Sequence, residues 1–116
     1  MKVVLVVFCI ALFLVGCKTT EPTYYYGAYP ETVYSYFNED DVSVSQQITI
    51  LEETIEQARG KNKPVPPGVH AHLGMLYFET GNTEQGLENF EQEKFLFKES
   101  TIYIDFLINN MAGAKI

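Results

Sequence analysis

Apolar residues recur along much of this chain at the three- and four-residue steps of an amphipathic helix. Ser43 and Gln46 have the spacing of a capping box, and Gly60 is placed to end a helix as the first residue beyond it. The apolar stripe between these signals consists of Val44, Ile48, Leu51, Ile55 and Ala58. The pattern predicts a first helix that begins near Ser43 and ends before Gly60, followed by a linker that its prolines stiffen.

The pattern predicts three further helices toward the carboxyl terminus. The first of these runs from about Pro67 to Thr80, the next follows the N-cap Asn82 and ends near Phe97, and the last begins after Ser100. The last helix is apolar on most sides, so we expect it to lie between neighbours or to cover a partner's surface. Because no segment alternates with period two, the predicted fold class is all-α, a small helical bundle.

The amino-terminal segment predicts export and lipidation. Thirteen unbroken apolar residues, Val3 to Val15, form a helix of about 20 Å, too short for a hydrocarbon core of about 30 Å. The tetrapeptide Leu14-Val15-Gly16-Cys17, at the end of this run, resembles the lipobox of bacterial lipoproteins, in which the cysteine becomes the lipidated first residue. The alternative is an ordinary signal peptide with an incidental cysteine.

Lipidation would divide the chain into a cleaved signal peptide, 1–16, a lipidated tether with a tyrosine-rich segment, 17–40, and a helical domain, 41–113. Lys18 stands where an aspartate would retain enterobacterial-type lipoproteins in the inner membrane, so the predicted location is the outer membrane, facing the periplasm. Two or three acyl chains on Cys17 give stable anchoring. The processed chain would keep no free thiol.

Charge narrows the classes of partner. From Cys17 onward the chain has seven basic and fifteen acidic residues, a net charge of about −8. Such a charge argues against nucleic acid and against anionic membrane surfaces as partners. The acyl chains are therefore expected to hold the protein to the bilayer.

Residues 67–100 fit one 34-residue tetratricopeptide-like helix-turn-helix unit. The matching positions are Leu73, Gly74, Tyr77, Gly81, Gly86 and Phe90. Glu93 and Lys98 depart from the pattern, and we expect Glu93 to pair with His70 or Lys94 or to hydrogen-bond the neighbouring helix. One repeat with flanking helices predicts a single concave face that binds a helix or strand of a partner.

The tyrosine-rich segment from Tyr24 to Tyr36, the run KPVPPGVHAHLGMLY and the run FEQEKFLFKES resemble a family of small, functionally uncharacterised Gram-negative lipoproteins with a tetratricopeptide-like region. Members of that family are typically encoded beside a lipoprotein that resembles the curli secretion channel and beside a second small lipoprotein. The resemblance implies an accessory part in an outer-membrane lipoprotein assembly. It supplies no catalytic residues.

The two histidines, His70 and His72, are the only ones in the chain. Positions two apart on a helix point about 200° from each other, so the pair is not expected to bind one metal ion. We expect His70 to pack against the second helix of the repeat and His72 to face outward.

Six of the eight tyrosines lie between residues 24 and 36. In one interpretation, Tyr29, Val33, Tyr36 and Phe37 form a short helix that docks on the bundle. In the other, the tyrosines form a recognition patch that stacks on the sugar rings of peptidoglycan or polysaccharide. The candidate interface residues are Tyr24, Tyr25, Tyr26, Tyr29, Tyr36, His72 and Met75.

The sequence displays no Ser-His-Asp order, no glycine-rich phosphate loop and no acid/base pair, which predicts a protein that is not an enzyme and needs no cofactor or metal. The predicted function is a scaffold in the envelope, with a curli-channel-like lipoprotein as the implied partner. The alternative is an independent glycan-binding lipoprotein that uses the tyrosines.

Overall fold

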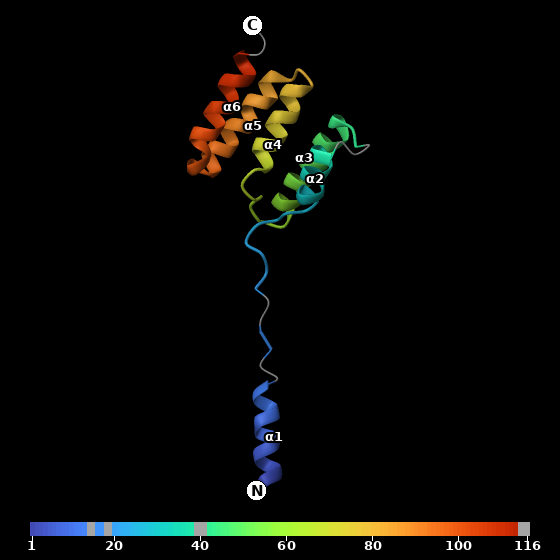
Figure 1. Ribbon diagram of the computed structural model, residues 1–116, viewed down its shortest axis with the longest axis vertical. Helices are drawn as coiled ribbons and strands as arrows, with labels where there is room; N and C mark the ends of the chain where they lie inside the picture. The colour runs from blue at the N-terminus through green and yellow to red at the C-terminus, as the bar shows by residue number, and fades with distance from the viewer. Residues whose placement is uncertain (14–15, 18–19, 39–41, 114–116) are drawn as a thin grey trace.

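The computed structural model of the chain describes residues 1–13, 16–17, 20–38 and 42–113 (Figure 1). Every regular element in these ranges is helical, which confirms the predicted all-α class. The elements are α1 (Lys2–Phe13), α2 (Tyr29–Asn38), α3 (Val44–Gly60), α4 (Val69–Glu79), α5 (Thr83–Leu96), the single 3-10 turn η1 (Lys98–Ser100) and α6 (Thr101–Gly113).

Helix α1 lies apart from the other helices along the long axis of the molecule (Figure 1). Among the described residues, no helix combines the length and the apolar character needed to cross a bilayer. The first two lipobox positions, Lys18 and the predicted domain boundary at residues 40 and 41 lie outside the described residues.

Helix α3 begins at the predicted capping box. The Ser43 hydroxyl accepts a hydrogen bond from the Gln46 backbone N–H at 3.2 Å, and the Gln46 side chain accepts one from the Ser43 N–H at 2.9 Å. The predicted role of Gly60 is wrong, because Gly60 is the last helical residue and Lys61 is the C-cap. Asn62 takes the left-handed conformation, φ +53°, which asparagine tolerates.

Helix α4 begins at Val69, two residues later than predicted, because Gly68 at its N-cap is left-handed, φ +102°. A glycine cap has no side chain to accept from the free amides of the first turn. The Glu93 carboxylate of α5 accepts instead from the backbone N–H of Gly68 at 2.7 Å and of Ala71 at 3.4 Å. Of the three roles considered for Glu93, the bond to the neighbouring helix is the one observed.

Helices α4 and α5 cross closely through two glycines. A methyl group at Gly74 would lie 2.6 Å from the Phe90 ring and 3.0 Å from the carbonyl oxygen of Gly86. Gly86 is similarly covered by the ring of Phe78, which stacks on Phe90 at a centroid distance of 5.4 Å. Ile104 of α6 completes this core, so α6 packs on the α4–α5 hairpin with one face.

The tyrosine-rich segment packs on the bundle, as the first of the two interpretations predicted. Helix α2 lies beside α3 (Figure 1), and Tyr29 and Tyr36 pack against the core cluster that contains Leu51 and Leu73. Phe37 was expected to dock with them, but its side chain is 75% exposed.

We predict that Gly74→Ala destabilises the protein by about 1–3 kcal/mol, because the added methyl overpacks a contact between two helices. Gly60→Ala is the matched control: no heavy atom outside its own helical turn lies within 4 Å of an added methyl. Its free energy of unfolding should rise by up to about 0.5–1 kcal/mol, because alanine favours the helix. Urea unfolding measures the free energy of unfolding of both variants. Equal changes in the two would contradict the close crossing of α4 and α5.

We predict that Glu93→Gln lowers the free energy of unfolding by about 1–3 kcal/mol, because an amide has one oxygen for two buried N–H donors. Glu91→Gln is the control, since Glu91 is exposed and makes a single surface ion pair with Lys94. That change should stay within about 0.5 kcal/mol in the same unfolding experiment. Equal losses in the two variants would refute the capping role of Glu93.

Candidate functional site

Four of the seven candidate interface residues meet at one pocket between α2, α4 and α6. They are Tyr29, Tyr36, His72 and Met75, and the pocket has a volume of about 210 Å³. Its other lining residues are Val33, Phe37, Gly68, Ala71 and Tyr103. We refer to this cavity as the α2–α4–α6 pocket.

Helical spacing explains how three helices build the pocket. Helix α2 contributes residues 29, 33, 36 and 37, and α4 with its N-cap contributes residues 68, 71, 72 and 75. Each set follows three- and four-residue steps and therefore lies on one face of its helix. Tyr103 of α6, 55% exposed, stands on a third side of the pocket.

His72 forms part of the pocket wall, and its predicted outward orientation is wrong. The side chain is 7% exposed because α2 covers this face of α4, with the Tyr36 ring edge-on to the imidazole at a centroid distance of 4.9 Å. Its Nε2 is buried and has no hydrogen-bond partner in the described part of the chain. Burial lowers the pKa of His72, and the nearby Glu79 carboxylate opposes that shift.

Two of the three tyrosines that line the pocket have raised pKa values, because of burial and nearby carboxylates. The Tyr36 hydroxyl donates to Glu79 at 2.6 Å, and this hydrogen bond, together with burial, raises the pKa of Tyr36 to about 12. The Tyr29 hydroxyl lies against the α-carbon of Gly68, where a side chain would collide with it. Burial and then the charge of Glu93 raise the pKa of Tyr29.

His70 lies away from this pocket, on the other side of α4. Its Nδ1 is 2.9 Å from the Asn89 side-chain oxygen on α5, so His70 contacts the second helix of the hairpin, as expected. It lines a polar groove of about 370 Å³ between α3, α4 and α5, where the Tyr77 hydroxyl donates to Glu52.

Three candidate tyrosines lie outside the pocket. Tyr24 packs edge-on to Phe97, and Tyr25 donates from its hydroxyl to Gln57 at 2.6 Å while Lys61 lies 4.8 Å from its ring centroid. Tyr26 is the most exposed of the three, at 47%. The aromatic faces of Tyr24 and Tyr25 therefore serve to bind the tyrosine-rich segment to the domain.

The remaining predicted residues occupy structural positions. Leu73 and Tyr77 belong to the core cluster with Leu51, and Gly81 turns the chain between α4 and α5 with φ +83°. Cys17, the predicted lipidation site, is exposed.

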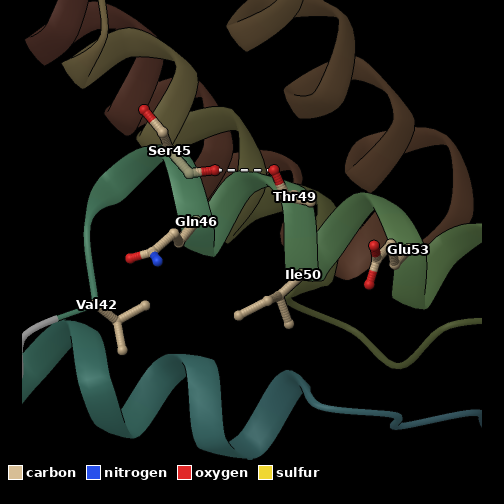
Figure 2. A pocket seen from close by; sticks show the side chains of 6 residues that line it. All are labelled: Val42, Ser45, Gln46, Thr49, Ile50 and Glu53. Carbon is tan, nitrogen blue, oxygen red and sulfur yellow. Dashed lines mark hydrogen bonds between the residues drawn. The ribbon is translucent and has the colours of Figure 1, made fainter.

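A larger, open hollow of about 610 Å³ lies along the outer face of α3. Figure 2 shows Val42 and Ile50 pointing toward α2, with Ser45, Thr49 and Glu53 spread along the helix. The Thr49 hydroxyl donates to the backbone carbonyl of Ser45, so it is already used within the helix. Among the described residues, no group of three or more His, Cys, Asp or Glu side chains could hold a metal ion.

Sequence reasoning missed three parts of the pocket: Gly68, Ala71 and Tyr103. A further missed residue, Glu79, bonds Tyr36 at the pocket. Helical spacing could have found those on α4 and its cap. Gly68 lies four residues before His72, and Ala71 and Glu79 lie four residues before and after Met75. Tyr103 lies on α6 and carries no such signal.

The structure therefore defines a small all-α protein with an aromatic pocket between non-consecutive helices. A family model described as "Domain of unknown function (DUF4810)" matches residues 23–107, and the chain belongs to that family. No curated protein and no solved structure matches the chain.

We predict that the protein loses stability as the pH falls below about 6.5 and that His72→Phe reduces this loss. Because the folded-state pKa of His72 lies below its usual 6.5, the unfolded chain binds a proton that the folded chain resists. Urea unfolding between pH 7.5 and 5 measures how steeply the free energy of unfolding falls as the pH falls. His70→Gln keeps His72 and should lose as much stability at low pH as the wild type. If His72→Phe lost stability as steeply as the wild type, the role assigned to the buried His72 would be contradicted.

Proposed function

We propose that this protein is a lipid-anchored accessory protein of the outer membrane that binds other envelope proteins through the α2–α4–α6 pocket. The observation that carries the proposal is the convergence of aromatic side chains from α2 and α6 on a pocket whose α4 wall holds a buried imidazole nitrogen without a partner among the described residues. A buried polar atom is normally paired, so an unpaired one calls for an explanation such as strain, an ordered water or a functional contact.

The size and the rim of the pocket favour a protein partner. Sites for free small molecules usually measure about 300–1,000 Å³, whereas this pocket has about 210 Å³. Phe37 and Tyr103 expose large aromatic surfaces at the pocket, and Ile102 and Phe106 of α6 are also exposed. Aromatic residues are enriched at protein interfaces.

The tetratricopeptide-like interpretation supports the same face. The pocket takes its walls from α2, α4 and α6, which alternate along the chain with α3 and α5. Stacked helix pairs of solenoid proteins likewise build concave surfaces that bind partners. The small residues Gly74 and Gly86 lie at the close crossing that a repeat of this kind requires.

The predicted anchor would keep the pocket near the bilayer. Tyr25 lies eight residues after Cys17, a span of at most about 29 Å. Tyr25 is tied to the domain, because its N–H donates to the carbonyl of Pro64 at 2.8 Å. A partner anchored in the same membrane would lie within this reach, and the family resemblance makes a curli-channel-like lipoprotein the first candidate.

Photo-crosslinking in the cells that make the protein tests the proposal. A photoreactive residue at Phe37 or Tyr103 should yield adducts with an envelope protein, because these side chains are exposed at the pocket. The same residue at Thr49 or Glu53, on the outer face of α3, should yield few. Equal adducts from both faces, or none, would refute binding through the pocket.

Cys17→Ser tests the anchor in the same cells. Palmitate labelling and recovery in the membrane fraction should be lost, and the adducts from Tyr103 should decrease because the local concentration of the partner falls. Unchanged labelling and fractionation would show that Cys17 is not lipidated.

A further inference from the structure

The charges near the α2–α4–α6 pocket are of one sign. The charged side chains that act on its titratable groups are Glu79, beside Tyr36 and His72, and Glu93, beside Tyr29. Within the described ranges, neither carboxylate belongs to an ion pair. A cation entering the pocket would therefore meet negative charge that the protein itself leaves uncompensated by a basic side chain.

The walls of the pocket suit a long side chain with a flat cationic end. Val33, Ala71 and Met75 offer apolar surface to an aliphatic stem. Tyr29, Tyr36, Phe37 and Tyr103 supply aromatic rings, which attract cations to their faces. Guanidinium stacks on aromatic rings better than the compact ammonium of lysine does.

His72 places an unpaired polar atom in the wall of the pocket. Its Nε2 is buried and without a partner among the described residues. A neutral imidazole that carries its proton on Nδ1 presents Nε2 as a hydrogen-bond acceptor. A guanidinium has only donors, so it can satisfy this atom without leaving an acceptor of its own unpaired.

The volume limits the occupant to one side chain. At about 30 Å³ for each water, the 210 Å³ of the pocket correspond to roughly seven waters. A second copy of the chain is a poor source, because its single arginine, Arg59, is paired with Glu56 and the chain carries a net charge of −7.

We propose that the α2–α4–α6 pocket receives one arginine side chain of the partner protein, with its stem on Met75 and Ala71 and its guanidinium between His72 and Glu79. This inference rests on the proposed binding function and specifies the chemistry of the partner. The segment of the partner that contacts the pocket should therefore be basic, although the partner protein as a whole need not be.

A displayed library of random ten-residue peptides, selected on the full chain in detergent micelles, tests the inference. Enriched peptides should share an arginine at one position. A synthetic copy of the best peptide should bind at least tenfold more tightly than its citrulline analogue, which keeps the shape of arginine without the charge. The proposal would be overturned if the selection recovered no binder or only binders without a basic residue. It would also be overturned if the citrulline analogue bound as tightly as the arginine peptide.

Two variants assign the binding to the pocket. Glu79→Gln, which can still accept from Tyr36, should weaken the arginine peptide at least fivefold and leave the citrulline peptide unchanged. Glu53→Gln, on the outer face of α3, should leave both unchanged; an equal effect of the two variants would place the arginine elsewhere.

If crosslinks from Tyr103 persist while the citrulline peptide binds as tightly as the arginine peptide, the arginine proposal fails and the proposed function stands.

Discussion

The buried carboxylate of Glu93 joins α5 to the first turn of α4, one of the helices that form the pocket. It is 2% exposed, and its stabilisation comes from backbone N–H groups at the positive end of α4. Gly68, one of its two donors, must be glycine because of its left-handed backbone and because the Tyr29 hydroxyl lies against its α-carbon. Helices α5, α4 and α2 therefore meet at Gly68, and this contact fixes the position of the first turn of α4.

The pocket depends on that contact and on the glycine crossing beyond it. Gly74 and Gly86 let α4 and α5 approach until Phe78 and Phe90 stack, and Ile104 of α6 packs on the same cluster. This packing brings Tyr103 of α6 to the pocket. A small domain thus positions this pocket through the contacts that stabilise its core.

His72 Nε2 and Gln47 Oε1 are the two buried side-chain atoms without a hydrogen-bond partner among the described residues, and each carries a local free-energy cost. An unsatisfied buried polar group costs about 1–3 kcal/mol, and the described residues leave this cost in place. A ligand that donates to Nε2 would recover it, which links the stability of the free protein to the affinity for a partner. Acidic charge also acts at this pocket, because Glu79 influences the pKa values of Tyr36 and His72 and Glu93 influences that of Tyr29.

The sequence alone determined the features that depend on neighbours along the chain: the all-α class, the Ser43–Gln46 capping box and the glycine turn before α5. Capping and periodicity act within a few residues, so local patterns specify them. Only the tertiary structure decided that His72 is buried while Phe37 is exposed, because helical periodicity gives a face but not which helix covers it. Glu93 likewise looked like a departure from a repeat, and its role became clear only where the amino end of α4 meets α5.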